Sequence, residues 1–164
     1  MRIIFLDFDG VLNSQSFYET RTEEKKAEDY PFRDLDNRAV GNLNIICEET
    51  SAKVVVTSTW RSGRSPAELQ KLLEPVGFKG EIIDKTPHLS NDYVLRGNEV
   101  LAWIKQNKPL LGKDYYDFHS YVIIDDDSDF LYWQKDNLLL TDVHNGLTHN
   151  TAYKAVRMFN KFVE

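Results

Sequence analysis

Residues 1–15 of the chain, MRIIFLDFDGVLNSQ, place two aspartates and a glycine directly after an apolar run. The run Ile3–Leu6 is typical of a strand that is buried on both faces in the middle of a parallel sheet. Asp7 and Asp9 come next, and carboxylates are costly to remove from water unless a cation or a reaction requires them. An ordinary Asp/Gly turn at the end of a strand would give the same residues. The residues at the ends of the other strands decide between these interpretations.

The composition predicts a globular protein. The chain 1–164 is expected to form a single domain, long enough to bury about two thirds of its unfolded surface. Hydrophobic residues make up 41% and charged residues 28% of the chain, which is ordinary for an enzyme of this size. The net charge of −6 (20 Lys and Arg against 26 Asp and Glu) excludes the overall basic character of a nucleic-acid coat protein, although it says little about a single groove.

The only cysteine is Cys47, which rules out an internal disulfide and suits a reducing cytoplasm. Cys47 lies in an amphipathic pattern, so we expect a small buried hydrophobe rather than a nucleophile. The N-terminus has no leader with an apolar core, and no apolar run reaches the length of a membrane span. We therefore expect a cytoplasmic protein with no membrane contact and no obligate protein partner.

Apolar runs alternate with amphipathic patterns along the chain. Strands are expected at residues 3–9, 54–59, 81–84, 121–126 and 137–142, and helices at 36–50, 65–77, 96–108 and 150–163. The last helix is expected to have Asn150 or Thr151 as its N-cap. The alternation predicts a three-layer α/β fold, in which helices cover both faces of a Rossmann-like parallel sheet.

Residues 15–34 interrupt this alternation. The segment is charged, has no clear apolar stripe and contains Pro31. It fits a solvated loop with a short helix. It also fits a small flap over the loop that begins with Asp7 and Asp9. In both cases the segment is too short for a large cap domain.

Polar residues end three of the expected strands. They are Asp7 and Asp9 at the first, Thr57, Ser58 and Thr59 at the second, and Asp125, Asp126, Asp127 and Asp129 at the strand 121–126. In a doubly wound sheet the carboxyl ends of the strands meet in one crevice, where ligands bind. So many carboxylates would repel one another without a cation, and oxygen ligands without Cys or His spacing favour Mg²⁺. The hydroxyl groups of the second strand are suited to hold a phosphate oxygen.

A phosphate bound in this crevice also requires a basic residue. Arg96 begins the expected helix at 96–108. Its guanidinium could pair bidentately with phosphate there, near the positive end of the helix dipole.

The first two strand ends resemble motifs of the haloacid dehalogenase (HAD) superfamily of phosphotransferases. The first HAD motif, D-x-D-x-[TV], corresponds to the stretch 7–11, which reads DFDGV. The second motif is a Thr or Ser that ends a strand, and it corresponds to Thr57 or Ser58.

The other two HAD motifs each have two candidates. The fourth motif, D-D or D-x-x-x-D after a strand, is matched by Asp125 with either Asp126 or Asp129. The third motif is usually a lysine, and Arg96 is the better match here, with Lys85 as the other candidate.

The resemblance implies a HAD-like fold with a minimal or absent cap and a Mg²⁺-dependent phosphomonoester hydrolase with an aspartyl-phosphate intermediate. Asp7 would be the nucleophile, and Asp9 would protonate the leaving oxygen and then accept a proton from water. The metal ligands would be Asp7, the backbone carbonyl of Asp9, and Asp125, with Asp126 beside them. Dehalogenases of the superfamily lack the second acid, so Asp9 favours phosphate chemistry over carbon–halogen cleavage.

Two further stretches, VVVTSTWR at 54–61 and VLRGNEVLAWI at 94–104, resemble phosphatase domains of polynucleotide kinase-phosphatases and RNA-repair proteins. In those domains a basic residue just beyond the second motif engages the substrate. Arg61 matches it, although Trp60 intervenes and the usual glycine is missing. Arg61 also fits a surface ion pair. The aromatic residues Trp60, Tyr93 and Trp133 are suited to stack on a base or to fill the core.

The sequence therefore predicts a phosphatase that acts on phosphorylated substrates such as nucleotides or nucleic-acid ends. The lack of a large cap supports this, because an open crevice admits a large substrate. The first alternative is a small-metabolite phosphatase with the same machinery. The second is a non-catalytic phosphate- or metal-binding module on the same fold, and Asp9 argues against it because a binding module needs no proton shuttle.

Overall fold

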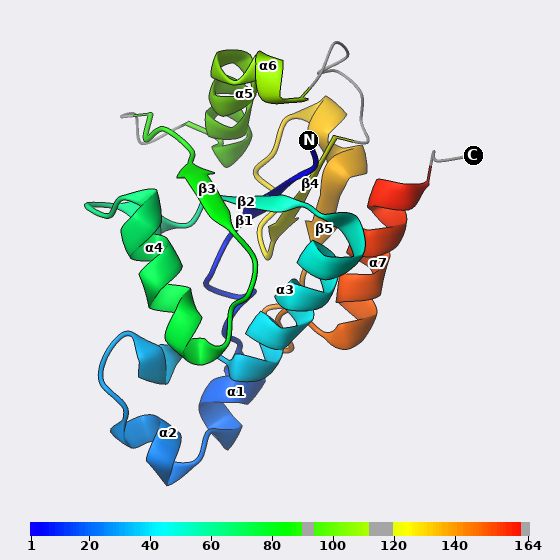
Figure 1. The fold of residues 1–164 in the computed structure, drawn as a ribbon. Helices are drawn as coiled ribbons and strands as arrows, with labels where there is room; N and C mark the ends of the chain where they lie inside the picture. Colours follow the sequence, from blue (N-terminus) through cyan, green and yellow to red (C-terminus); the bar gives the residue numbers. More distant parts are fainter. Residues whose placement is uncertain (90–93, 112–119, 162–164) are drawn as a thin grey trace.

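Parallel strands form one sheet in the described part of the chain. The structure is a computed structural model, and it describes residues 1–89, 94–111 and 120–161. The strands are β1 (Ile3–Leu6), β2 (Lys53–Val56), β3 (Ile82–Lys85), β4 (Tyr121–Asp125) and β5 (Leu138–Leu140), in the order β3-β2-β1-β4-β5 (Figure 1). Every pairing between them is parallel. The predicted α/β fold with a Rossmann-like sheet is confirmed.

The central strand is β1, as its apolar run predicts. Each of its four residues is fully buried, and each pairs with both β2 and β4; Ile3, for example, lies opposite Lys53 and Tyr121. The chain adds β2 and β3 on one side of β1 and then crosses to add β4 and β5 on the other side. The order in which the chain adds strands reverses between β1 and β4, and ligands bind at this reversal point in sheets of this type.

Helices connect these strands. The α-helices are α1 (Gln15–Thr20), α2 (Glu23–Ala27), α3 (Asn37–Thr50), α4 (Pro66–Leu73), α5 (Arg96–Gln106), α6 (Lys108–Leu111) and α7 (His149–Asn160). The short 3₁₀ helices are η1 (Phe32–Asp34), η2 (Thr59–Arg61), η3 (Glu74–Val76) and η4 (Tyr132–Asn137).

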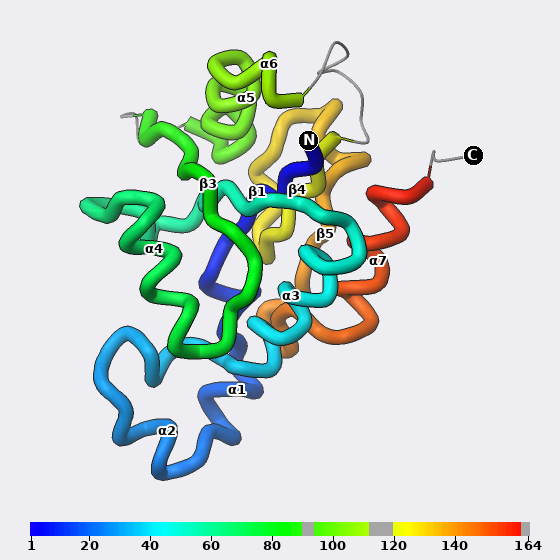
Figure 2. Tube along the Cα trace, viewed as in Figure 1, coloured from blue at the N-terminus to red at the C-terminus, as the bar shows by residue number. Residues whose placement is uncertain are grey.

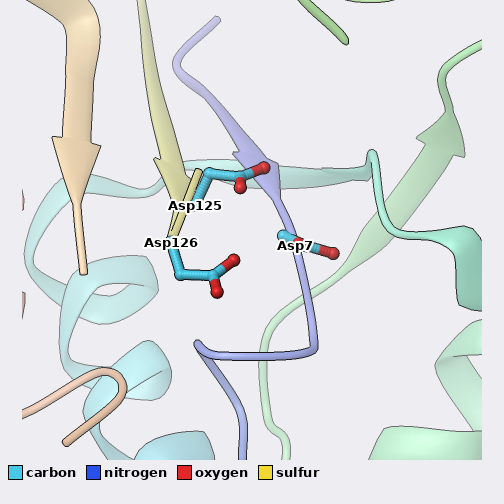
Figure 3. A group of neighbouring side chains, drawn as sticks. All are labelled: Asp7, Asp125 and Asp126. Atoms are coloured by element: carbon cyan, nitrogen blue, oxygen red, sulfur yellow. The ribbon is translucent and has the colours of Figure 1, made fainter. Parts of the chain in front are cut away.

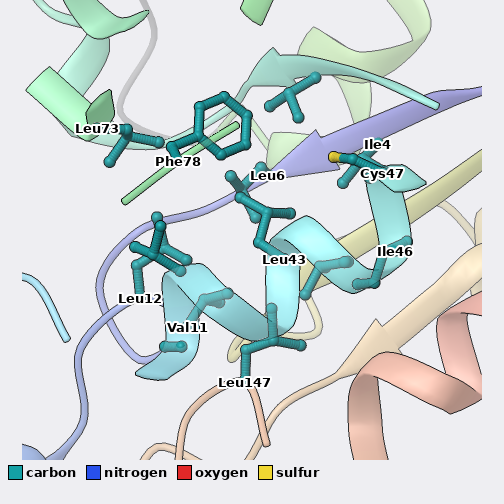
Figure 4. Packing of buried hydrophobic residues seen from close by; sticks show 14 of the residues in the cluster. Ile4, Leu6, Val11, Leu12, Leu43, Ile46, Cys47, Leu73, Phe78 and Leu147 are labelled. Atoms are coloured by element: carbon teal, nitrogen blue, oxygen red, sulfur yellow. The ribbon is translucent and has the colours of Figure 1, made fainter. Parts of the chain in front are cut away.

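The two faces of the sheet are covered by different helices (Figures 1 and 2). Ile4 and Leu6 of β1 belong to the larger apolar cluster, which α3, α4 and α7 cover (Figure 4). Ile3 and Phe5 belong to a second cluster with Trp103 of α5. Because successive side chains of a strand point to opposite faces, a single apolar strand organises all three layers.

Cys47 lies in the larger cluster and is buried, as predicted (Figure 4). Burial raises the pKa of its thiol to about 12. The thiol is therefore a packed apolar group and is not activated as a nucleophile.

The expected elements form with shifted ends. The strands expected to include Asp9, Thr59 and Asp126 stop earlier. Asp9 and Asp126 lie in the loops after β1 and β4, and Thr59 begins η2. The N-cap of α7 is Thr148, whose side chain accepts a hydrogen bond from the Thr151 backbone N–H. The expected cap at Asn150 or Thr151 was therefore wrong, because the helix already includes both residues.

Residues 15–34 form α1, α2 and η1, which lie outside the sheet (Figure 1). Phe17 is the one buried residue of α1, and α2 has no buried residue. The segment forms more helix than the solvated loop that its charge suggests, because Ser14 and Thr22 cap its two short helices. No helix of the described ranges is long and apolar enough to cross a membrane.

Candidate active site

Three carboxylates meet where β1 and β4 end (Figure 3). Asp7 comes directly after β1, Asp125 is the last residue of β4, and Asp126 is the next residue. One oxygen from each side chain lies within 4.8 Å of the other two. Asp7 is 4% exposed and Asp125 is fully buried. Like charges packed this closely and away from water are unfavourable unless a positive charge balances them.

Arg96 supplies a positive charge at this cluster. Its Nη1 donates to Asp7 Oδ2 at 2.7 Å and to Asp125 Oδ2 at 2.6 Å. Arg96 is the first residue of α5, and the position of that helix brings its side chain over the ends of β1 and β4. Burial acts to lower the pKa of Arg96, but the charges of Asp125 and Asp7 outweigh this and raise it above its usual value.

The pKa values of Asp125 and Asp126 are also shifted by burial and by the neighbouring charges. Burial, together with the smaller effect of the Asp7 charge, raises the pKa of Asp125 to about 7, although Arg96 acts in the opposite direction. Burial and Asp7 also raise the pKa of Asp126. A cation bound among these oxygens would favour their ionised forms. The cluster is therefore suited to bind more positive charge than Arg96 alone provides.

Asp9 is exposed and is not part of this three-carboxylate group in the described chain. Asn13 Nδ2 donates to its Oδ1 at 2.9 Å, and Trp60 Nε1 donates to its Oδ2 at 3.0 Å. Asn13 is itself buried, and its Oδ1 accepts a hydrogen bond from the Gly10 backbone N–H at 2.9 Å. The Asp9 carboxylate is thus fixed by two N–H donors while it faces solvent.

The backbone conformation and the close surroundings of position 10 explain why a glycine comes after the two aspartates. Its φ of +69° lies in the left-handed region, which residues with a Cβ rarely adopt. A Cβ at this position would also lie 2.3 Å from Asp126 Oδ2. Only glycine lets the loop after β1 pass this close to the end of β4.

The two hydroxyl residues after β2 differ in their surroundings. Thr57 is 1% exposed, and its Oγ1 has no hydrogen-bond partner within the described residues. The Ser58 hydroxyl accepts a hydrogen bond from the Trp60 backbone N–H at 3.3 Å and so caps η2. Buried hydroxyls normally have a partner, so the Thr57 hydroxyl is the better candidate to bind a ligand oxygen.

Arg61 lies inside the protein with 5% of its surface exposed. Its Nη2 donates to Glu99 Oε2 at 2.6 Å. The other donors of its guanidinium bind backbone carbonyls of Thr57, Ser58, Thr86 and Pro87. Burial lowers the pKa of Arg61, with Glu99 acting in the opposite direction. The predicted surface ion pair is therefore wrong in its location, since the acid that pairs with Arg61 is buried. The predicted contact with substrate stays a prediction.

The structure separates the two candidates for the basic motif. Arg96 contacts the acidic cluster, whereas Lys85 Nζ donates to the backbone carbonyls of Arg61 and Arg64 at 3.2 and 2.5 Å. It also separates Asp126 from Asp129. Asp126 belongs to the cluster, and Asp129 Oδ2 accepts the backbone N–H of Arg96 at 3.1 Å. Asp129 therefore holds the start of α5.

Three contacts of the site were missed from the sequence. They are the bonds of Asn13 and Trp60 to Asp9, and the pairing of Glu99 with Arg61. Asn13 lies three residues after a turn glycine, which is a weak local signal. The contacts of Trp60 and Glu99 join residues 51 and 38 positions apart, and no spacing pattern reveals them.

The other two predicted aromatic residues do not extend the described site. Trp133 lies in η4 with 49% of its surface exposed. Tyr93 lies outside the described residues.

The strand order and the acidic cluster define an α/β domain of the HAD type. A family model described as "HAD domain in Swiss Army Knife RNA repair proteins" matches residues 3–152, and the chain belongs to this family. No curated protein and no solved structure matches the chain. The matched range includes β1 to β5 and every predicted site residue. The predicted resemblance to HAD phosphatases of RNA repair is confirmed.

HAD domains generally use Mg²⁺, and the donor set of this site fits such an ion. Three carboxylates offer converging oxygens within 4.8 Å of one another, and hard oxygen ligands are those that Mg²⁺ prefers. The close approach of Gly10 to Asp126 keeps the loop after β1 beside these oxygens.

Proposed function

We propose that the protein is a Mg²⁺-dependent phosphomonoester hydrolase that forms an aspartyl-phosphate on Asp7, with nucleotides or nucleic-acid ends as substrates. One observation carries the proposal: three carboxylates, those of Asp7, Asp125 and Asp126, converge beside Arg96. They do so where the order of the parallel strands reverses. Membership of a HAD family supports the reaction class.

The metal would be held by Asp7, Asp125, Asp126 and the backbone carbonyl of Asp9. When bound, it would offset the repulsion between a carboxylate nucleophile and an anionic phosphate. Metal ligation also accounts for a buried carboxylate such as Asp125, whose ionised form burial alone disfavours.

Asp7 is the proposed nucleophile. One of its oxygens attacks phosphorus, the bond from phosphorus to the leaving oxygen breaks, and water then hydrolyses the aspartyl-phosphate. Arg96 donates to Asp7 Oδ2, which leaves its positive charge next to the carboxylate that would carry the phosphoryl group. The hydroxyl of Thr57, which has no hydrogen-bond partner in the described part of the chain, is the proposed donor to a phosphoryl oxygen. Ser58, which caps η2, would support the position of Thr57 rather than bind phosphate itself.

Asp9 is the proposed acid and base. It protonates the leaving oxygen in the first half-reaction and accepts a proton from the attacking water in the second. Its exposed carboxyl group is suited to this role, because the leaving group and the water both reach the site from solvent. A non-catalytic binding module would not need a second acid, Asp9, fixed in the same loop as Asp7.

Nucleotides or nucleic-acid ends are the proposed substrates for two reasons. The family to which the chain belongs is described by its occurrence in RNA repair proteins. Aromatic side chains also lie beside Asp9: Trp60 donates to its carboxylate, and the exposed ring of Tyr30 lies 6.3 Å from that of Trp60. Aromatic rings at a site entrance bind bases by stacking. Residues 15–34, which include Tyr30, are the proposed small flap of this single domain.

The test is a hydrolysis assay with and without Mg²⁺. The panel contains p-nitrophenyl phosphate, glycerol phosphate, nucleoside 3′- and 5′-monophosphates, and oligonucleotides with a 3′- or 5′-phosphate. We expect Mg²⁺-dependent release of phosphate, suppressed by EDTA, with higher kcat/KM for nucleotides or oligonucleotide ends than for glycerol phosphate.

The other outcomes contradict the proposal at different levels. Preference for a small non-nucleotide phosphate would support the small-metabolite alternative and overturn the substrate assignment. Mg²⁺ binding without hydrolysis of any compound would support the binding-module alternative. Hydrolysis that Asp7→Asn leaves unchanged would place the chemistry at another site.

A further inference from the structure

Trp60 makes a contact with Asp9, and Trp60 lies outside the four motifs named above. The indole Nε1 donates to Asp9 Oδ2 at 3.0 Å, across the gap between the loop after β1 and the turn after β2. An indole N–H is a donor only, so Trp60 can neither take nor pass on a proton. On a substrate that has no base to stack on the ring, an effect of this residue on proton transfer must therefore act through the position of Asp9.

The ring of Trp60 is itself held in place. Its centroid lies 5.4 Å from that of Phe8 and 6.3 Å from that of Tyr30. Its backbone N–H is bound by Ser58 Oγ, and its carbonyl accepts from Arg64 Nη1 at 2.8 Å. A side chain fixed by packing and by backbone contacts can fix the group to which it donates.

Asn13 completes the arrangement. Its Nδ2 donates to Asp9 Oδ1, so each carboxylate oxygen of Asp9 has one N–H donor. Each oxygen keeps a second lone pair, which can carry the proton that the reaction moves. The two donors fix the plane of the carboxylate without blocking proton transfer.

From this geometry we infer that Trp60 is a positioning residue for the acid–base work of Asp9. The inference rests on the proposed function. In the first half-reaction the bond from phosphorus to the leaving oxygen breaks, and the proton of the Asp9 carboxyl group moves to that oxygen. In the second half-reaction water attacks the aspartyl-phosphate, Asp9 takes its proton, and phosphate leaves Asp7. Trp60 and Asn13 stabilise the Asp9 carboxylate that exists between these steps.

The inference predicts a dependence on the leaving group. An alkoxide is a poor leaving group and needs the proton, whereas p-nitrophenolate leaves without one. Trp60→Phe removes the N–H but keeps a ring to pack against Phe8 and Tyr30. The kcat/KM value reports the steps up to departure of the leaving group, so it isolates the acid role of Asp9 from its later base role.

For Trp60→Phe we expect kcat/KM on glycerol phosphate to fall about tenfold, a part of the usual 10²–10⁴-fold worth of a general acid. On p-nitrophenyl phosphate we expect less than about a twofold change, because the general acid is not needed. Trp133→Phe is the matched control, since Trp133 is exposed on η4, an element that carries none of the proposed site residues. It should leave both values unchanged.

A double-mutant cycle separates positioning from a general structural effect. In an Asp9→Asn background, Trp60→Phe should cause no further loss on glycerol phosphate, because the group on which it acts is gone. Equal losses on both substrates in the single variant, or an undiminished loss in the Asp9→Asn background, would overturn the inference. No change on either substrate would overturn it as well.

The hydrogen bond can be checked without any activity. The chain has three tryptophans, and Trp60→Phe identifies the Trp60 indole N–H peak in a ¹H–¹⁵N spectrum of the metal-free protein. Asp9→Ala should shift this peak and leave that of Trp133 in place. An unmoved Trp60 peak would contradict the inference. If wild-type protein hydrolyses no phosphomonoester while the peak shifts, the proposed function fails and the contact stands.

Discussion

Arg96 and Arg61 are two arginines at the same edge of the sheet, and they have opposite surroundings. Arg96 lies between two carboxylates that are close to each other and partly uncompensated. Arg61 lies between one carboxylate and four backbone carbonyls, so its donors are matched by acceptors around it. Each makes an ion pair of 2.6 Å, yet the first region has excess negative charge and the second does not.

The difference separates a reactive site from its support. Excess negative charge in a buried place is unfavourable for stability and useful for binding a cation or activating a nucleophile. The guanidinium of Arg61, whose donors are all bound within the protein, joins the loop after β2, the loop after β3 and α5. We therefore expect variants of the first region to lose activity and variants of the second to lose stability.

The largest effect is expected for Asp7→Asn. The amide cannot attack phosphorus, so turnover should fall by at least about 10⁴-fold, as it does when a catalytic nucleophile is removed. No acid-stable phosphoenzyme should be trapped after a rapid quench. Asp136→Asn, an exposed acid on η4, is the control and should behave as wild type. Trapped phosphoenzyme in the Asp7 variant would assign the nucleophile elsewhere.

Asp9→Asn is expected to have the next largest effect. The backbone carbonyl that would ligate the metal is kept, while the proton shuttle is lost. The rate on an alkyl phosphomonoester should fall about 10²–10⁴-fold. Isothermal titration with Mg²⁺ should show little change in the dissociation constant from the wild-type value. A near-normal rate on glycerol phosphate would refute the shuttle role.

Arg96→Ala should reduce kcat/KM on every substrate, p-nitrophenyl phosphate included. The expected loss is about 10²–10³-fold, the usual effect of removing one donor that faces developing charge. Arg38→Ala is the control, because Arg38 makes an exposed ion pair with Asp36 at the start of α3. A loss confined to oligonucleotide substrates would move Arg96 from the phosphoryl group to a more distant contact.

Arg61→Ala tests the second region. Removing one partner of a buried pair leaves Glu99 without its arginine, with the Leu89 backbone N–H still bound to it, and should destabilise the protein by about 3–5 kcal/mol. For a chain of this length the midpoint of thermal unfolding should fall by about 10 °C, against about 1 °C for Arg38→Ala. If Arg61 also contacts substrate, as the sequence predicts, KM for an oligonucleotide end should rise while p-nitrophenyl phosphate is spared. Unchanged stability would contradict the supporting role.

The smallest expected effect is on the pH dependence of stability, and it tests whether the region around Arg96 has the excess negative charge that the region around Arg61 lacks. Burial and Asp7 raise the pKa of Asp125 from 3.8 to about 7 in the folded protein. The folded state then binds a proton more tightly than the unfolded state, so this stabilisation is complete below about pH 4 and lost as the pH rises toward 7. In EDTA, the unfolding midpoint of wild type should fall by a few degrees between pH 5 and 8 relative to Asp125→Asn. A parallel pH dependence of the two proteins would show that Asp125 does not titrate in this range.

The sequence by itself determined which segments form the sheet and which polar residues come at the ends of its strands. The apolar run before Asp7, the β-branched run before Thr57 and the apolar run before Asp125 each specify a buried strand, because periodicity and hydrophobicity are local properties. Since parallel strands end at one edge, acids that come directly after β1 and β4 are expected to meet, as Asp7, Asp125 and Asp126 do. The sequence also predicts a turn at Gly10, but it does not predict how closely Gly10 approaches Asp126.

Only the tertiary structure showed how the paired candidates for each motif differ in their contacts. The sequence favours Arg96 over Lys85 and leaves open the choice between Asp126 and Asp129 and between Thr57 and Ser58. Arg96 contacts the acidic cluster, whereas Lys85 binds backbone carbonyls. Asp126 belongs to the cluster, whereas Asp129 binds the backbone N–H of Arg96. Ser58 caps η2, whereas the Thr57 hydroxyl has no partner among the described residues. The inward position of Arg61 and the bond from Trp60 to Asp9 were decided in the same way. The physical reason is that burial and hydrogen-bond partners depend on contacts between segments far apart in the chain, and such contacts leave no periodic signal in the sequence.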